Sequence, residues 1–374
     1  MRRIGVTLAC ALLASLTVNA ARAAADTWER AFPTLDNVRD VVWHDAPTTW
    51  WVTTCNPIDG LTLRRTEDDG GAWTTVATGL GAGKTPPTCW VRLSYGVFRA
   101  DPSVIYRTDG RMHRSDDGGS TWRTLDMRPP GDVDYFEGDN QYSGVAVSPT
   151  NPDRIAYAHH GTHLRGGATV RDMATDDFAM DPGAATMWVH PDTGAAYYGN
   201  YRGGKRRGVV DFDSLGLVNL AGGSQDYSVG FGFSSDRPPR YFDVWVDQLS
   251  GGYVPPVIVR GPHADDLPTD ELFAAGAILE VAESIAVDAA TDTIYLAGTT
   301  REDAAELREV VIASVDGGES WAEVGDMSGQ LYFLSGHDAL FMQTDDDLYR
   351  LALPTSVSAW GKASTTWGAL KRGR

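Results

Sequence analysis

Short runs of alternating apolar and polar residues, broken by Gly, Asp and Pro, dominate the chain. Examples are YSGVAVS (142–148), VIYRT (104–108) and LEVAESIAV (279–287). A period of two puts successive side chains on opposite faces of an extended strand, so these runs predict short β-strands. Helical candidates are limited to two short segments, 269–279 and 303–309. The pattern predicts an all-β protein.

One eight-residue frame, S/T-x-D-x-G-x-(T/S/A)-W, occurs three times. Its Asp carboxylate and its Ser or Thr hydroxyl can accept backbone N–H groups that a tight turn leaves unpaired. Its Gly adopts positive φ at little steric cost, and its Trp buries a large apolar face between sheets. One carboxylate per turn is too few for calcium, so we interpret the frame as structural. The predicted turn residues are Thr66, Asp68, Gly70 and Trp73; Ser115, Asp117, Gly119, Thr121 and Trp122; and Ser314, Asp316, Gly318, Ser320 and Trp321.

The spacing of the frame predicts a repeat. The three copies begin at residues 66, 115 and 314, which fits a period near 50 with degenerate copies near 165, 215 and 264. A strand bearing an aromatic residue forms a second marker, at Trp50–Trp51, Tyr106, Tyr157, Tyr197–Tyr198, Trp245, Tyr295 and Phe341. Regular units of four strands predict a β-propeller. We expect seven blades, the seventh completed by an N-terminal strand within residues 28–44, with six blades as the alternative.

The frame resembles the Asp-box, or BNR repeat, of sialidases, xyloglucan-cleaving glycosidases, sortilin-type receptors and Ycf48-like photosystem assembly factors. The resemblance implies a propeller with the Asp-box turn between the third and fourth strands of a blade. It implies no particular activity, because one fold carries many functions.

The family activities fit this chain unequally. The sialidase arginine motif near the first blade is absent, and Arg237-Pro238 comes too late in the chain to replace it. The xyloglucanases resemble two propellers in tandem, and the sortilin-type receptors have more blades and a cysteine-rich module. Ycf48-like proteins are similar in length, in export and in having no catalytic set, which favours a binding propeller.

The N-terminus has the features of a secretory signal. Arg2 and Arg3 precede an apolar run too short to span a membrane, and Ala21-Arg22-Ala23 is an A-x-A cleavage site. We therefore predict a signal peptide at residues 1–23, one propeller domain at 24–356 and a C-terminal tail at 357–374. The exported chain is periplasmic or secreted.

The net charge limits the kinds of binding partner, and the cysteine count predicts a disulfide. The signal removes three arginines and no acid, so the formal charge of −18 becomes −21. Such a surface repels nucleic acid and anionic membranes. Cys55 and Cys89 remain in an oxidising compartment, which predicts one disulfide and no thiolate zinc site. We expect a monomer with no membrane span and no cofactor.

Two loops and one linker carry the candidate site, on the face opposite the Asp-box turns. The catalytic candidates are His159, His163, Tyr201, Arg202, Asp134 and Glu137, and the ligand-binding candidates are His160, Arg165, Lys205, Arg206 and Arg207. Asp132 and Asp139 accompany the linker acids. A local basic cluster on an acidic chain predicts an anionic or carboxylate ligand.

Several chemistries fit these residue types. The acids can simply pair with the arginines, act as glycosidase carboxylates, or accompany a His or Tyr base and an Arg in a lyase. His159 and His163 are at i, i+4, but Gly161 indicates a loop, so we predict no metal site. His44 is interpreted as first-blade structure. The sequence favours a binding module for a glycan or an exported protein. A carbohydrate-active enzyme is the alternative, and a structural repeat protein without a site is a third possibility.

Overall fold

The computed structural model describes residues 27–45, 47–56, 58, 60–80, 94–108, 111–127, 141–160, 167–182, 186–199, 207–219, 226–233, 241–247, 257–261, 270–274, 279, 281–288, 291, 293–303, 306–316, 318, 320–334, 336–344 and 347–353. Their regular structure consists of seven four-stranded antiparallel sheets. The predicted signal peptide (1–23), the tail (357–374) and Cys89 lie outside the described residues.

Four sheets are formed by the first part of the chain. They contain β2 (Val38–Asp45), β3 (Thr49–Asn56), β4 (Gly60–Thr66) and β5 (Thr74–Leu80); β6 (Ser94–Val97), β7 (Ile105–Thr108), β8 (Met112–Ser115) and β9 (Arg123–Thr124); β10 (Gln141–Val147), β11 (Arg154–His160), β12 (Gly167–Asp172) and β13 (Phe178–Pro182); and β14 (Thr186–Val189), β15 (Ala196–Gly199), β16 (Arg207–Asp211) and β17 (Gly216–Asn219).

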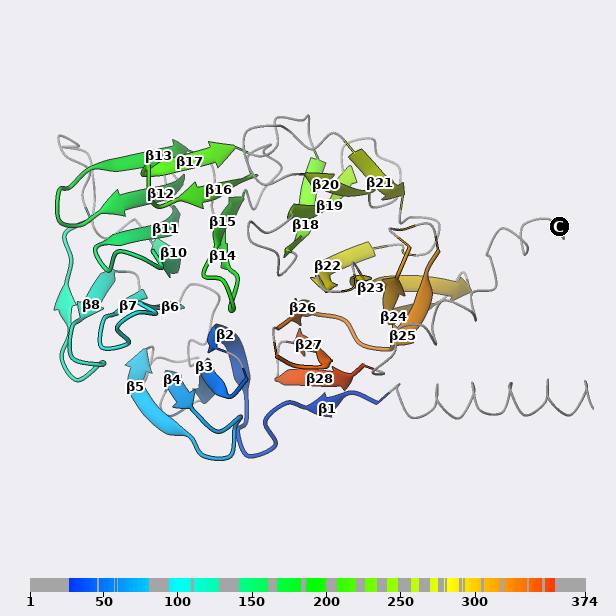
Figure 1. Ribbon diagram of the computed structural model, residues 1–374, viewed down its shortest axis with the longest axis horizontal. Helices are drawn as coiled ribbons and strands as arrows, with labels where there is room; N and C mark the ends of the chain where they lie inside the picture. Colours follow the sequence, from blue (N-terminus) through cyan, green and yellow to red (C-terminus); the bar gives the residue numbers. More distant parts are fainter. Residues whose placement is uncertain are drawn as a thin grey trace, which may run out of the picture.

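Three further sheets complete the fold. They contain β18 (Asp226–Phe233), β19 (Tyr241–Asp247), β20 (Val257–Gly261) and β21 (Asp270–Ala274); β22 (Val281–Asp288), β23 (Thr293–Asp303), β24 (Glu306–Ser314) and β25 (Ala322–Gly325); and β26 (Gln330–Phe333), β27 (Ala339–Gln343), β28 (Leu348–Ala352) and β1 (Glu29–Arg30). The sheets follow one another around a common centre in chain order, which is the arrangement of a β-propeller (Figure 1).

The N-terminal strand closes the ring. β1 pairs antiparallel with β28, so the last sheet contains strands from both ends of the chain. The Arg30 guanidinium donates to Asp347 Oδ2 (2.7 Å) and to the Leu35 carbonyl oxygen (2.7 Å), which ties the closing strand to the segments that precede β28 and β2. β1 lies within residues 28–44, the range in which a closing strand is expected, and it is the fourth strand of the last sheet.

Both faces of a sheet are buried against its neighbours, which explains adjacent apolar residues in one strand. In β3, Trp50 belongs to a core with Phe341 and Leu348 of the last sheet, whereas Trp51 belongs to a core with Tyr95 and Ile105 of the next. Successive side chains point to opposite faces of a strand, so each tryptophan fills a different interface. The predicted aromatic markers all lie on the second strand of their sheets: β3, β7, β11, β15, β19, β23 and β27.

The three repeated turns join third to fourth strands and use one hydrogen-bond pattern. Ser115 Oγ donates to Asp117 Oδ1 (2.8 Å) and accepts from the Gly119 N–H (2.8 Å). Asp117 also accepts from Thr121 N–H (2.8 Å) and from Thr121 Oγ1 (2.6 Å), and Trp122 Nε1 donates to the Gly119 carbonyl (2.9 Å). The Ser hydroxyl and the Asp carboxylate thus accept backbone N–H groups inside the turn, and Gly119 has a φ of 90°.

The first copy of the turn is weaker than the other two. Thr66, Asp68 and Gly70 repeat the central bonds, and Ser314, Asp316 and Gly318 do so in the third copy. Ala72 stands where Thr121 and Ser320 donate a second bond to the carboxylate. Trp73 Nε1 is buried without a hydrogen-bond partner, whereas Trp122 and Trp321 bond the turn glycine.

Three local expectations were wrong or displaced. Residues 270–274 form β21, and the segment at 303–309 ends β23 and begins β24, so neither candidate helix is present there. Antiparallel pairing with β20 and within the β23–β24 hairpin overrides their helical propensity. The turn expected near 165 lies at 173–177, after β12, whereas the turn near 215 follows Asp211 as expected. The connection near 264 lies outside the described residues.

Candidate functional site: the central channel

Few of the sequence-predicted site residues are described by the structure. His159 and His160 end β11, where they pair with Tyr142 and Gln141 of β10, and Arg207 begins β16. His163, Arg165, Tyr201, Arg202, Lys205, Arg206, Asp132, Asp134, Glu137 and Asp139 lie outside the described residues. β11 and β16 belong to neighbouring sheets. The end of β11 and the start of β16 lie at the same edge of the ring, where the second strand of each sheet leads to the third.

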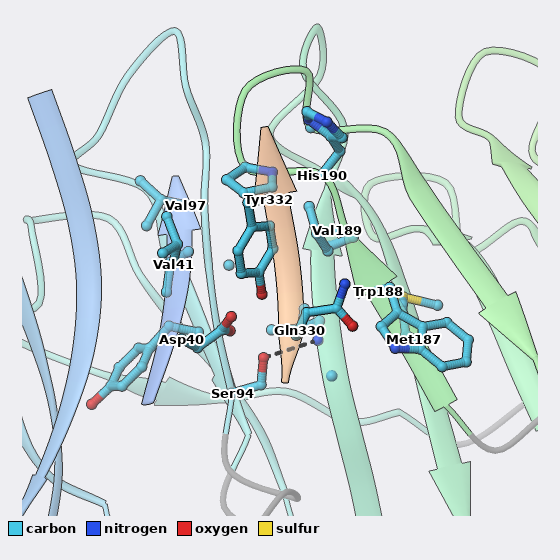
Figure 2. Close-up of a pocket in the computed structure, with 18 of the residues that line it drawn as sticks. Asp40, Val41, Ser94, Val97, Met187, Trp188, Val189, His190, Gln330 and Tyr332 are labelled. Carbon is cyan, nitrogen blue, oxygen red and sulfur yellow. Dashed lines mark hydrogen bonds between the residues drawn. The ribbon is translucent and has the colours of Figure 1, made fainter. Parts of the chain in front are cut away.

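A cavity of about 140 Å³ lies at the centre of the ring, between first strands of different sheets. We call it the channel pocket. β2, β6, β10, β14, β22 and β26 contribute its walls. Figure 2 shows Asp40, Ser94 and Gln330 at one end, His190 at the other, and Tyr332 between them with its hydroxyl pointing toward Asp40 and Gln330.

Backbone features bring the polar residues into the pocket. The register of β2 shifts between Val38 and Asp40, so Arg39 is an extra residue in a β-bulge. Beyond the bulge, the side chain of Asp40 no longer follows the regular alternation between the two faces of the strand. Gly96 lets β6 approach β10, because a Cβ at this position would lie 2.9 Å from the Val145 carbonyl oxygen. Ser94 Oγ accepts a 3.4 Å bond from the Val145 N–H across the same gap. Tight packing of the first strands thus fixes the polar end.

Asp40 is the electrostatically unusual residue of the pocket. Enclosure by protein raises its pKa from 3.8 to about 6, and a hydrogen bond from the Val41 N–H opposes the rise. The side chain is accessible from the cavity, so solvent there screens part of the effect. Burial and the Asp40 charge together raise the pKa of Tyr332 well above its usual range. Among the described residues, no basic side chain forms an ion pair with Asp40.

A loop between β14 and β15 closes the other end. The Arg99 guanidinium donates to the carbonyl oxygens of His190 (3.1 Å), Pro191 (2.5 Å) and Asp192. The His44 N–H donates to the Pro191 carbonyl oxygen (3.0 Å). Figure 1 shows the β14–β15 hairpin reaching toward β2 at the centre. This closed end lies at the C-terminal ends of the first strands. The polar end, formed by Asp40, Ser94 and Gln330, lies near their N-terminal ends.

A buried Asp–His–His chain holds the closing loop. Asp192 Oδ1 is 2.5 Å from His44 Nδ1, and His44 Nε2 is 3.0 Å from His337 Nε2. If Asp192 accepts from Nδ1–H, then His44 Nε2 accepts from His337, which fixes both tautomers. Burial and the neighbouring His44 lower the pKa of His337.

The Asp–His–His chain supports the structural interpretation of His44. An Asp–His pair can orient a catalytic base, but His44 is 1 % exposed and both its ring nitrogens are engaged within the protein. The described residues contain no group of three or more His, Cys, Asp or Glu side chains that could hold a metal ion.

Sequence reasoning missed the channel pocket. Asp40, Ser94, Gln330 and Tyr332 come from three different sheets and form no local motif. The available signal is the Arg39–Asp40 pair inside a mostly apolar segment, VRDVVW. Cys55, at the end of β3, is disulfide-bonded, and Cys89, the partner that the sequence predicts, lies outside the described residues. Within the described ranges no helix has the length and apolar character needed to cross a membrane.

Comparison with known proteins supports the fold. No family model and no curated protein sequence matches the chain. Among solved structures it is similar to "YCF48 bound to D1 peptide" (TM-score 0.53, 13 % identity, 88 % of this chain and 96 % of that one). It is also similar to YCF48 from Cyanidioschyzon merolae (TM-score 0.52, 14 % identity, 87 % and 98 %).

A glycosidase propeller is a further structural neighbour. The chain is similar to the GH74 xyloglucanase from Xanthomonas campestris (TM-score 0.50, 14 % identity), covering 87 % of this chain and 53 % of that one. This chain therefore spans about half the length of the xyloglucanase. At these identities the likenesses show the fold alone, and that fold is the β-propeller.

Proposed function

We propose that this chain is an exported, seven-bladed Asp-box propeller that binds a segment of a partner protein at its central channel. The observation that carries the proposal is the channel pocket, which is closed at one end by the 190–194 loop and lined at the other by Asp40, Ser94 and Gln330. Concave sites with a few convergent polar groups on apolar walls are the usual form of ligand pockets.

Several features support the finer parts of this proposal. Seven four-stranded sheets favour seven blades over six, and the shared turn geometry favours the Asp-box assignment. The disulfide at Cys55 favours an oxidising compartment and hence export through the predicted signal peptide. Two of the similar structures are YCF48 propellers, one of them bound to a D1 peptide, and the likeness spans nearly their whole length.

The predicted loops would extend the same site. β11 ends at His160, paired with the first residue of β10, and β16 begins at Arg207. These strand ends lie at the edge from which Ser94 and Gln330 enter the channel, since all of them belong to the face where blades connect. We propose that the His and Arg loops surround the polar end and contact the parts of the ligand that stay outside the pocket.

A carbohydrate-active enzyme is the second candidate, favoured by one observation. A pKa of about 6 suits Asp40 to proton transfer near neutral pH. A glycosidase needs a second carboxylate, and Asp40 is the sole one among the described residues that line the pocket. The predicted acids Asp134 and Glu137 would have to supply it.

A panel experiment separates these candidates. The purified mature chain is incubated with exported-protein peptides and with acidic and neutral polysaccharides, while binding, new reducing ends and absorbance near 235 nm are followed. The proposal expects retention of a peptide without product. New reducing ends would indicate hydrolysis by the carboxylates, and a rise near 235 nm would indicate β-elimination, and either would contradict a pure binding role.

A further inference from the structure

The geometry points to a specific ligand group: we propose that the channel pocket binds the cationic end of a peptide side chain, with arginine preferred over lysine. This inference rests on the proposed binding function and deepens it, because it names the chemistry of the group that enters the pocket.

The polar end presents two strong acceptors, the Asp40 carboxylate and the side-chain oxygen of Gln330. The Asp40 carboxylate has no described basic partner. Gln330 donates its Nε2–H to the Leu331 carbonyl oxygen (3.2 Å), which leaves its side-chain oxygen as an acceptor in the pocket. The hydroxyl groups of Ser94 and Tyr332 can each donate as well as accept, and Ser94 Oγ already accepts from the Val145 N–H. A guanidinium carries five N–H donors and no acceptor, so it is complementary to this set.

The walls suit the rest of an arginine side chain. Tyr332 is aromatic, and Val41, Val97 and Val189 are apolar, so a methylene stem and a planar cation both find partners there (Figure 2). A cavity of about 140 Å³ is comparable to the ~150 Å³ cavity that accommodates a benzene molecule. The size therefore fits one side-chain end.

The cation already present at the closed end does not satisfy Asp40. Arg99 lies in the pocket wall, but its guanidinium is held by the carbonyl oxygens of the 190–192 loop. Enclosure raises the pKa of Asp40, and the Val41 N–H opposes the rise. The polar end thus retains an uncompensated carboxylate on an acidic protein, which attracts cations.

Cation binding should therefore depend on pH. Binding requires the ionised Asp40, so affinity is full above pH 6 and falls as the pH drops through that value. The other titratable or charged groups of the pocket wall are Tyr95, Tyr332, His190 and Arg99. Tyr332 stays neutral because its pKa is raised, and burial lowers the pKa of His190 to about 4, so neither changes charge between pH 5 and 8.

The test uses capped peptides that differ in one side chain. Ac-Gly-Gly-Arg-Gly-Gly-NH₂ is compared by calorimetry with its citrulline and lysine analogues at pH 7.5 and pH 5. Citrulline is a neutral near-isostere of arginine. We expect the arginine peptide to bind at least ~10-fold more tightly than the citrulline peptide at pH 7.5, and the preference to shrink at pH 5.

Two variants decide whether the pocket is responsible. Asp40→Asn should abolish the preference for arginine, whereas Asp45→Asn should retain it, because Asp45 is an exposed acid at the far end of the same strand. Tyr332→Phe provides a second pocket variant with a smaller expected loss. Equal binding of arginine and citrulline, or an arginine preference that survives Asp40→Asn, would overturn the inference.

The failure of this inference is distinguishable from failure of the proposed function. A neutral peptide or a polysaccharide bound equally well by the native chain and by Asp40→Asn would overturn the cation site and leave a binding propeller intact. Cleavage of a bound ligand would instead overturn the binding-only function.

Discussion

Replacing Asp40 by Asn should stabilise the protein at neutral pH. Enclosure raises the pKa of Asp40 from 3.8 to about 6, so the folded state holds the proton more tightly than the unfolded chain. Ionising this carboxyl therefore costs the folded state up to about 3 kcal/mol in full enclosure. Because the side chain is accessible from the cavity, solvent screening reduces the expected cost to roughly 1 kcal/mol. Asn keeps the shape and removes the charge.

The difference in the free energy of unfolding between the native protein and the Asn variant should grow as the pH rises. Below pH 3.8 the carboxyl is neutral in both states, so the native and Asn proteins should have similar free energies of unfolding. As the pH rises to about 6, the native protein loses stability that the variant keeps, and the difference then stays constant. Urea unfolding without reductant, at half-unit steps from pH 3.5 to 8, measures it.

Asp45→Asn is the matched control, because it removes one exposed acid from the same strand and should show no such pH-dependent gain. A variant at Asp40 that is less stable than the native protein at pH 8 would refute the reasoning. A stability difference that does not change between pH 3.5 and 8 would refute it as well.

Three further predictions concern the turns and the closing loop. Gly119→Ala should cost roughly 2–3 kcal/mol by urea unfolding, because φ is 90° and the new Cβ would lie 2.9 Å from a carbonyl oxygen. Gly118→Ala meets no atom within 4 Å and should cost only about 1 kcal/mol. Arg99→Met should cost about 2–4 kcal/mol and speed amide exchange of the N–H groups that bond the loop. Hydrogen bonds from Thr121 and Ser115 hold the pKa of Asp117 at about 2, which carboxyl NMR should report.

Each of these three predictions can be contradicted by a specific result. Equal costs at Gly118 and Gly119 would exclude the steric account of the turn. Unchanged exchange after Arg99→Met would mean that the guanidinium does not hold the loop. The Asp117 bonds stabilise the protein fully above pH 3.8, and this stability is lost as the pH falls through about 2. Titration of Asp117 near 4 would show that its carboxylate is not held by the turn.

The turns and the repeat were predictable because their interactions are local. Ser115 bonds Asp117 and Gly119 within four residues, so the residue types alone specify the contacts. The aromatic markers were predictable for a related reason: each sheet repeats one burial pattern, and Trp50 and Tyr106 occupy equivalent second strands.

The channel pocket was not predictable by the same means. Asp40 and Tyr332 lie near opposite ends of the chain and meet only because the ring closes through β1 and β28. Their proximity depends on the number and order of the sheets, which no local pattern encodes. The helical expectation at 303–309 was wrong for a similar reason, since pairing within the β23–β24 hairpin outweighs local propensity.

A single series of peptide titrations tests whether Asp40 binds the ligand. The peptide that binds most tightly in the panel is titrated at pH 7.5 into the native chain, Asp40→Asn and Asp45→Asn. The molecular mass of the recovered peptide is then measured by mass spectrometry. The account predicts an affinity at least ~10-fold weaker for Asp40→Asn, unchanged affinity for Asp45→Asn, and a peptide of unchanged mass. Equal affinity for Asp40→Asn, or a cleaved peptide, would contradict it.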